Sequence, residues 1–518
     1  MRVLCLGLDG ADYDLVRKLL EQGRLPTLAR LAREGTFGPL RSTIPAFTPT
    51  AWSSFLTGLN PAGHGIFAFT SNPNRGGGRL ESAASRAGAP LWRYLGAAGI
   101  RSAFVTVPFT HPPEPLSGIL VTGFGGPRRP EIVPLAARNA ILTSHPDLRV
   151  SRHPSDLQDF AAATATLSNH IDEIADVCFL VLELEPDLGL LCVDFMSSDI
   201  AGHLLWHRLD PSHPAHRADD AGDELVQVYE AVDAACGRVI EQAEWLWDEP
   251  PTVFVLSDHG MKPTHWLFRA NRWLEEAGYL CFRKDATART MAEPAAYAPE
   301  LEHTLVEEQP PFAEIDFGET RAYCFGYGGQ IYLGEVTGAE EDSGLASELA
   351  EALAEVRHPE SGEPAFDVRK KEELYRGFYL DRAPELVLLP RDERVHVDST
   401  RQRWSETFQR HERLFTRGTA HFSGQHALTG ILAAAGPGVG RVAVPPGFEI
   451  TQIPATLLAL HGLEAELEAP AIEAILDTAA TGPRRQVEGV SQTPVEPSGY
   501  TPEEEDLIVR RLRDLGYE

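Results

Sequence analysis

Several short apolar runs in this sequence end directly in an aspartate or a histidine, and this pattern constrains the fold more than any other feature. Residues 3–8 precede Asp9, residues 188–193 precede Asp194, and residues 253–256 precede a Ser-Asp-His sequence. The runs are continuously apolar rather than alternating, which is typical of parallel strands that are buried on both faces of a sheet.

Helical stretches separate these runs, and the pattern predicts helices over 13–34, 155–182 and 218–245. Strands that alternate with helices predict an α/β fold, with a doubly wound, mostly parallel central sheet and helices on both faces. In such sheets ligands gather at the carboxyl ends of the strands. We therefore expect the polar residues that follow each run to share one site.

The length of 518 residues favours a large catalytic core that carries an insertion. Turn-rich, less regular sequence interrupts the strand and helix pattern after residue 270, and a polar, proline-bearing stretch precedes a C-terminal amphipathic helix over 501–515. That helix is expected to pack on the body or on a second subunit of a homodimer. The predicted parts are a core at 1–270 and 414–465, a cap or lid at 271–413, and a linker with the C-terminal helix at 466–518.

The chain has a formal net charge of −29, which limits its partners. Nucleic acid as a bulk partner requires clustered Lys and Arg, whereas a small phosphate ester stays compatible if metal cations reverse the local field. Six cysteines without a C-x-x-C pair predict a reducing compartment and no disulfide framework. Since we find neither a transmembrane segment nor a signal peptide, we expect a cytoplasmic location.

Four segments far apart in the chain carry metal-ligand residue types at the ends of predicted elements. Carboxylate and imidazole together suit zinc, with manganese as the alternative where oxygen ligands dominate. An isolated Asp-Gly is usually a turn and an isolated histidine is usually a satisfied polar residue, so the argument rests on the whole set. The candidates are Asp9, Asp199 and His203 of a D-x-x-G-H sequence, the adjacent Asp258 and His259, and His426.

A fifth segment, residues 44–66, carries a candidate nucleophile. Thr48 precedes Pro49 at a predicted helix start, where free backbone N–H groups and the helix dipole favour an anion and a lowered hydroxyl pKa. The alternative is that Thr48 only caps the helix, with Pro49 as the first helical residue. This segment alone leaves both interpretations open.

In this order and spacing, the motifs resemble the alkaline phosphatase superfamily, in its branch of type I phosphodiesterases and nucleotide pyrophosphatases. The resemblance covers residues 1 to about 462 of the sequence. The motifs that carry it are Asp9-Gly10, Thr48 with Thr57-Gly58, His64-Gly65-Ile66, D-x-x-G-H at 199–203, Ser257-Asp258-His259-Gly260-Met261, and His426 ahead of 430–438.

The resemblance implies hydrolysis of a phosphodiester or nucleotide pyrophosphate-type bond by in-line displacement, through a phosphothreonine intermediate. Alignment on the Thr-Gly pair downstream selects Thr48 as the nucleophile over Thr50. The resemblance also implies two divalent metal ions. The implied ligands are Asp199, His203 and His426 for one ion, and Asp9, Asp258, His259 and Thr48 for the other.

Two departures limit what carries over from the family. Related nucleotide pyrophosphatases place an asparagine three residues after the nucleophile, where this chain has Ala51, so a phosphoryl oxygen needs another donor. Threonine at the nucleophile position argues against sulfatase chemistry, which needs a modifiable Cys or Ser. The alternatives are a phosphomonoesterase or a phosphoglycerate mutase-like phosphotransferase on the same core, and a noncatalytic metal-binding protein.

Other residues near these motifs receive lesser roles. His207, His213 and His216 are expected in an exposed loop or at the substrate rim, because turn-forming prolines interrupt them. Asp194 is expected at most to support a metal ligand. His64 is expected to have a structural role at the close of the nucleophile helix. Trp52 and Trp206 are placed to line the pocket, but packing is the favoured role for both. Tyr327 is a lid candidate.

Overall fold

The structure of this protein is a computed structural model. The helix predicted over 501–515 lies outside the described residues, except for Ile508, which is buried against the main core. The described residues are 1–72, 78–154, 159–218, 222–283, 315–335, 339–399, 406–412, 422–444, 446–477, 482–490 and 508.

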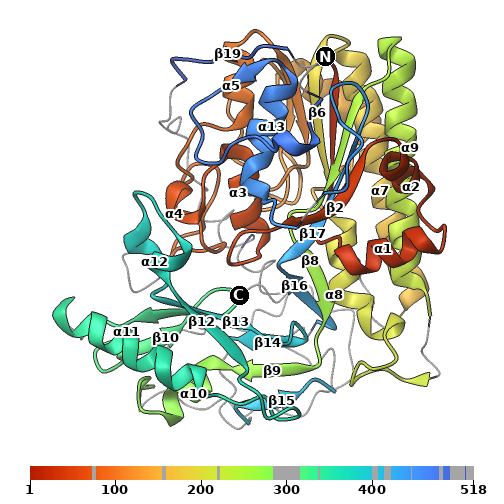
Figure 1. Ribbon diagram of the computed structural model, residues 1–518. Coiled ribbons are helices and arrows are strands. Elements are labelled where there is room, and N and C mark those ends of the chain that lie inside the picture. The colour runs from red at the N-terminus through yellow and green to blue at the C-terminus, as the bar shows by residue number, and fades with distance from the viewer. Residues whose placement is uncertain are drawn as a thin grey trace.

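An eight-stranded mixed sheet lies at the centre of the described part of the chain (Figure 1). In spatial order its strands are β2 (Thr36–Arg41), β17 (Thr429–Ala435), β7 (Thr252–Leu256), β1 (Val3–Leu8), β6 (Leu188–Phe195), β3 (Arg101–Val105), β4 (Gly118–Val121) and β5 (Ile132–Val133). The strands from β7 to β4 run parallel, whereas β17 and β5 are antiparallel to their neighbours. The predicted mostly parallel sheet is confirmed.

Helices cover both faces of this sheet. The side chains of β1 alternate between two apolar clusters, one on each face. Leu4 and Leu6 belong to one cluster, and Val3 and Cys5 belong to the other. The helices that contribute to the first cluster include α1 (Tyr13–Glu21), α2 (Pro26–Glu34), α6 (Leu135–Ser144), α7 (Phe160–Leu184), α8 (Ser197–Leu209) and α9 (Glu224–Trp247). Those of the second are α3 (Thr48–Thr57), α5 (Leu91–Ala97) and α13 (Ile453–Leu460).

The helix predicted over 13–34 is two helices, α1 and α2. Gly23 adopts a positive φ of 71° after α1, and Pro26 begins α2. Both residues interrupt a continuous helix, since glycine accepts the left-handed region and proline cannot continue a preceding turn. The helix predicted from 155 begins at Phe160, where Asp159 accepts a hydrogen bond from the Ala162 N–H, and residues 155–158 lie outside the described residues.

A third apolar cluster and a smaller sheet follow most of the main core in the chain and lie below it in Figure 1. The sheet contains β10 (Ala322–Cys324), β11 (Gln330–Leu333), β13 (Leu386–Pro390) and β12 (Phe366–Lys370), with α10 (Ala270–Glu276), α11 (Ala339–Ala354) and α12 (Lys371–Leu374) near it. Short strand groups connect the parts: β9 (Trp266–Arg269) between β14 (Val395–Asp398) and β15 (Phe408–Arg410), and β8 (Gly260–Pro263) with β16 (Gly424–Ala427). The exact cap boundaries stay a prediction.

Within the described ranges, no helix has both the length and the apolar composition that crossing a membrane would require. The six cysteines are free thiols, and all but Cys281 are buried.

Candidate active site

The parallel register of three neighbouring strands brings distant polar residues to one edge of the sheet. Gly7 of β1 lies opposite Asp194 of β6 on one side and opposite Leu256 of β7 on the other. Asp9 directly follows β1, and Asp258 lies two residues after the end of β7. The remaining predicted site residues come from α8 (Ser197–Leu209), from the start of α3 and from β16: Asp199 and His203, Thr48, and His426.

The first ligand group consists of Asp9, Asp258 and His259, whose ligand atoms all lie within 4.8 Å of one another. His259 Nε2 lies 3.3 Å from Asp258 Oδ2 and 3.6 Å from Asp9 Oδ1. The opposite ring nitrogen, Nδ1, donates to the Gly260 carbonyl at 3.0 Å. This bond fixes the tautomer that points the Nε2 lone pair at the two carboxylates.

Thr48 belongs to this first group by position. Its Oγ1 lies 3.3 Å from His259 Nε2, and the residue is fully buried. Thr48 is the first residue of α3, whereas Phe47 holds the N-cap position and makes no side-chain cap. The capping alternative for Thr48 is therefore wrong, and its hydroxyl faces the carboxylate and imidazole groups instead.

The second group consists of Asp199, His203 and His426. Asp199 Oδ1 lies 3.4 Å from His203 Nε2 and 3.2 Å from His426 Nε2, and the two Nε2 atoms are 3.0 Å apart. Both histidines donate Nδ1–H to backbone carbonyls, of Gly424 at 2.8 Å and of Ala46 at 3.1 Å. In the neutral tautomers that these carbonyls select, two lone pairs face each other, and a cation between them would remove that repulsion.

His259 lies between the two groups. Its ring stacks on that of His426 with 3.7 Å between centroids, and its ligand atom also lies within 4.8 Å of those of Asp199 and His426. The structure thus brings all seven predicted site residues together, and that they bind metal stays a prediction.

Burial governs the electrostatics of the site. Burial and the neighbouring carboxylates, Asp258 first among them, raise the pKa of Asp9 well above its ordinary value. Burial raises the pKa of Asp258 to about 7, and burial lowers the pKa of His259 to about 4 and of His426 to about 3. Without a cation, burial therefore favours the neutral forms of these four groups. Asp199 is the exception, because His203 and His426 outweigh its burial and lower its pKa well below the ordinary value.

The donor set fits divalent metal ions. Asp9 Oδ1 and Asp258 Oδ2 are buried and accept no hydrogen bond from the residues that the structure describes. Unsatisfied buried carboxylate oxygens are costly, and metal coordination is one of the few ways to compensate them. A mixture of imidazole nitrogen and carboxylate oxygen suits zinc, and an oxygen-rich group accepts manganese as well.

Two aromatic residues contact this site, for which the sequence favoured packing in the case of Trp52 and a lid role in the case of Tyr327. Trp52 Nε1 donates to Asp9 Oδ2 at 2.9 Å. The spacing of four residues from Thr48 places Trp52 on the same helix face, a signal that was available in the sequence. Tyr327 accepts the His426 backbone N–H at 2.9 Å. No local pattern links Tyr327 to a residue about one hundred positions away.

Exposure is wrong for two of the three histidines that were predicted in an exposed loop or at the substrate rim, and His207 lies within α8 rather than in a loop. His207 and His213 are only 5% and 3% exposed, and His216 is partly buried. His213 donates Nε2–H to the Ser423 carbonyl at 3.1 Å and accepts the Ala215 N–H at 3.0 Å. The turns form as expected, but the segment that carries Ser423 covers them, and both His213 nitrogens are occupied by backbone.

Asp194 and His64 lie outside the two ligand groups. Both carboxylate oxygens of Asp194 are buried without a hydrogen-bond partner in the described part of the chain, and burial raises its pKa well above the ordinary value. His64 contacts Ser54 of α3, with Nε2 3.0 Å from the Ser54 hydroxyl, and accepts the Ile66 N–H at 3.1 Å. It has the structural role that the sequence predicted.

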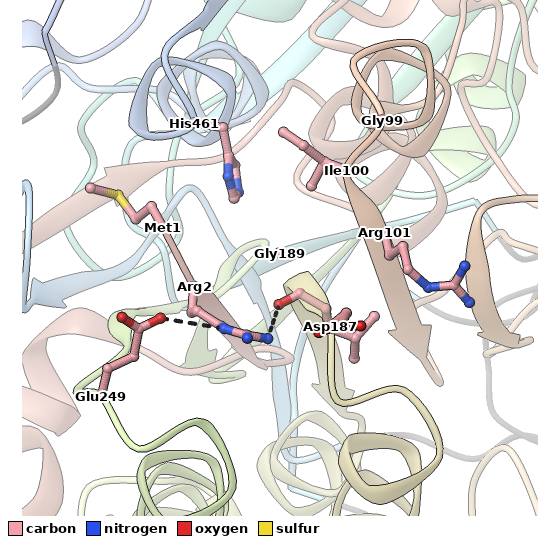
Figure 2. Close-up of a pocket in the computed structure, with 10 residues that line it drawn as sticks. Met1, Arg2, Gly99, Ile100, Arg101, Asp187, Gly189, Glu249 and His461 are labelled. Atoms are coloured by element: carbon pink, nitrogen blue, oxygen red, sulfur yellow. Dashed lines mark hydrogen bonds and ion pairs between the residues drawn. The ribbon is translucent and has the colours of Figure 1, made fainter.

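A separate cavity of about 300 Å³ lies at the amino ends of β1, β3 and β6, at the opposite edge of the sheet (Figure 2). Arg2 in its wall donates to the Pro186 and Leu188 carbonyls and pairs with Glu249. His461 also lines this cavity.

Comparison with known families agrees with this geometry. The model of the type I phosphodiesterase / nucleotide pyrophosphatase family matches residues 3–419. The chain belongs to this family. Membership makes it a hydrolase that acts on phosphoric ester bonds, and it confirms the predicted resemblance and enzyme class.

Solved structures of similar fold include human ectonucleotide pyrophosphatase / phosphodiesterase 5, with 14% identity, a TM-score of 0.51, and coverage of 92% of this chain and 100% of that chain. Phosphonoacetate hydrolase from Sinorhizobium meliloti 1021 has 15% identity, a TM-score of 0.51, and coverage of 88% and 94%. At these identities the likeness shows the fold alone. Comparison with curated proteins gave no match.

Proposed function

We propose that this phosphodiesterase-family chain hydrolyses a phosphodiester or pyrophosphate-type bond by attack of Thr48 on phosphorus, with two divalent metal ions. The observation that carries the proposal is the position of Thr48 Oγ1, 3.3 Å from His259 Nε2 and at the point where both ligand groups meet. Zinc is the first choice for both ions, and manganese is the second.

The residues divide between two metal positions. When bound, such ions lower the pKa of a coordinated hydroxyl and stabilise negative charge on phosphoryl and leaving-group oxygens. The buried carboxylate oxygens and the fixed histidine tautomers support this division. Asp9, Asp258, His259 and Thr48 would hold one ion, and Asp199, His203 and His426 would hold the other.

Thr48 supplies the nucleophile, and its place in the fold suits that role. As the first residue of α3 it lies at the positive end of the helix dipole, which favours a developing alkoxide. The fully buried side chain excludes bulk water from the hydroxyl in this conformation. Substrate therefore reaches Thr48 only when the residues that cover it shift.

The reaction proceeds in two displacements. In the first, a bond forms between Thr48 Oγ and phosphorus while the bond to the leaving oxygen breaks, and the proton lost by the threonine hydroxyl is balanced by one taken up by the leaving oxygen. In the second, the oxygen of water bonds to phosphorus and the Oγ–P bond breaks; one proton of the water restores the threonine hydroxyl, and the other is released as the new phosphate group ionises. Each displacement inverts phosphorus, so the net result is retention.

A threonine in this role is supported by one similar structure. Murine ectonucleotide pyrophosphatase / phosphodiesterase 5 was solved as an inactive threonine-to-alanine form in complex with AMP, with 15% identity to this chain. Nucleotide specificity does not follow for the present chain, because Ala51 stands where related enzymes place an asparagine.

The test compares kcat/KM for an aryl phosphodiester and an aryl phosphomonoester on zinc- or manganese-loaded protein. Thr48→Ala is expected to lower diester turnover by about a thousandfold or more, since removing a nucleophile leaves only binding and electrostatic effects. Thr50→Ala is the matched variant, because Thr50 is the second-choice nucleophile on the same helix and is equally buried. It is expected to keep most of the activity.

Each contrary outcome has a distinct meaning. A monoester preference would move the protein to the phosphomonoesterases or phosphotransferases of this fold. Activity that survives Thr48→Ala but not Thr50→Ala would transfer the nucleophile to Thr50. A protein that takes up two ions but hydrolyses neither ester would favour a noncatalytic role.

A further inference from the structure

A glycine-rich turn between β10 and β11 brings Tyr327 from the smaller sheet to the catalytic edge. Gly326, Gly328 and Gly329 adopt φ values of 76°, 75° and 75°, a left-handed region that favours glycine. A Cβ on Gly329 would lie 2.8 Å from the Leu388 carbonyl, so the backbone packs closely there. The turn thus depends on its glycines to place the one large side chain among them.

Gln330 fixes this turn to the main core. It is fully buried, and its amide donates to the Phe67 carbonyl at 3.1 Å and to the Tyr327 carbonyl at 2.9 Å. Its side-chain oxygen accepts the Tyr332 hydroxyl at 3.0 Å. Three hydrogen bonds on one buried amide hold the Tyr327 backbone in place relative to the core.

The Tyr327 side chain makes contacts with two parts of the active site at once. Its hydroxyl donates to Gln425 Oε1 and accepts the His426 backbone N–H at 2.9 Å. Its ring stacks on Phe47 at 4.6 Å between centroids and 11° between planes. Phe47 directly precedes the nucleophile, and the His426 ring lies 4.7 Å from the Tyr327 ring.

These contacts form a closed series, called the circuit below, in which each residue contacts the next and the last contacts the first. Tyr327 holds the backbone of His426, His426 Nδ1 donates to the Ala46 carbonyl at 3.1 Å, and the next residue, Phe47, returns to the Tyr327 ring. The circuit joins the strand that carries one metal ligand to the segment that carries Thr48. Displacement of any member would change the separation between that ligand and the nucleophile.

We propose that Tyr327 is a positioning residue, which sets the distance between His426 and Thr48 through its hydroxyl and its ring. This inference rests on the proposed function, because it treats His426 as a metal ligand and Thr48 as the nucleophile. The Tyr327 hydroxyl bonds to the His426 backbone rather than to its ring nitrogens, and the Tyr327 ring packs on Phe47 and on the His426 ring, so Tyr327 acts through these two residues.

A simpler alternative is that the Tyr327 ring only shields the site from solvent. The two roles make different predictions for the hydroxyl, because shielding requires the ring alone whereas positioning also requires the hydroxyl. Tyr327→Phe keeps the ring and removes only the hydroxyl. The matched control is Tyr323→Phe on β10, because Tyr323 is also buried and its hydroxyl donates a comparable bond, to Asn72 Oδ1 at 2.7 Å.

The first readout is metal affinity, measured by competition with a chromophoric chelator on protein loaded with zinc. Tyr327→Phe is expected to bind one of two ions about tenfold more weakly, the lower range seen when groups that orient metal ligands are removed. The second readout is diester kinetics, in which kcat should fall while KM changes little, because ground-state binding is not altered. Tyr323→Phe should match wild type in both.

The proposal is overturned if Tyr327→Phe and Tyr323→Phe both match wild type in metal affinity and kcat. It is also overturned if Tyr327→Phe lowers only the melting temperature, since the hydroxyl would then be a folding contact. Measurements of metal content and turnover on the wild-type protein test the proposed function independently of the role of Tyr327. A wild type that binds two ions without hydrolysis refutes the function, while the affinity comparison still decides the role of Tyr327.

Discussion

Replacing Asp258 with asparagine is expected to stabilise the metal-free protein at pH 8 while it weakens metal binding. Asp258 is 1% exposed, and its Oδ2 accepts no hydrogen bond from the described residues. Asparagine keeps the oxygen that accepts the Gly10 N–H at 3.2 Å. Its amide N–H groups would face His259 Nε2, which lies 3.3 Å from Oδ2 and is an acceptor in its fixed tautomer.

The magnitude follows from the pKa of Asp258, which burial raises from 3.8 to about 7. Between these values the folded state binds a proton that the unfolded state does not, so the free energy of unfolding falls as pH rises through this window. The full cost, about 4 kcal/mol, is present above pH 7. Asparagine does not ionise, so Asp258→Asn should gain about this amount at pH 8 and nothing below pH 4.

The assay is thermal and urea unfolding at several pH values in excess chelator, followed by titration of zinc into both proteins. Asp194→Asn is the matched control, because Asp194 is equally buried and its pKa is also raised by burial, yet it lies outside both ligand groups. Both variants should be stabilised without metal, and only Asp258→Asn should lose metal affinity. An Asp258→Asn protein that is no more stable than wild type at pH 8 would refute the reasoning.

Three further outcomes are expected. Trp52→Phe removes the donor to Asp9 Oδ2 and should weaken metal binding by about tenfold in chelator competition; unchanged affinity would show that this bond does not orient the carboxylate. Arg269→Met removes the guanidinium that lies 2.6 Å from the Asp398 carboxylate and should cost about 3 kcal/mol in unfolding experiments, a loss that Asp398→Asn should partly restore in the double variant. Zinc binding at pH 6 should release protons because Asp258 is then protonated, and calorimetry in buffers of different ionisation enthalpy should show less release at pH 8.

Local patterns predicted the elements that hold the catalytic edge. The apolar run over 3–8 is β1, and the runs at 188–193 and 253–256 lie within β6 and β7. These predictions succeed because a strand buried on both faces needs apolar residues at every position, which the sequence displays directly. The location in the cytoplasm and the homodimer are not decided by the fold and stay predictions.

Predictions from local sequence patterns were wrong where the burial of a residue depends on segments far away in the chain. The prolines after α8 predicted turns correctly, but His213 is buried and bonds to Ser423, about two hundred residues later in the chain. His207 lies within α8, and its ring contacts that of Phe160. Trp52 was treated as packing because an indole in a helix usually packs, and only the meeting of α3 with β1 shows its bond to Asp9.

The sequence by itself determined which residue types are available for chemistry and that parallel strands would carry several of them to one edge. Only the tertiary structure decided that His259 lies between the two ligand groups and that Tyr327 joins His426 to the Thr48 segment. The physical reason is range: strand and helix patterns arise from burial of near neighbours, whereas these contacts join residues 47, 259, 327 and 426, whose proximity depends on the packing of the whole chain.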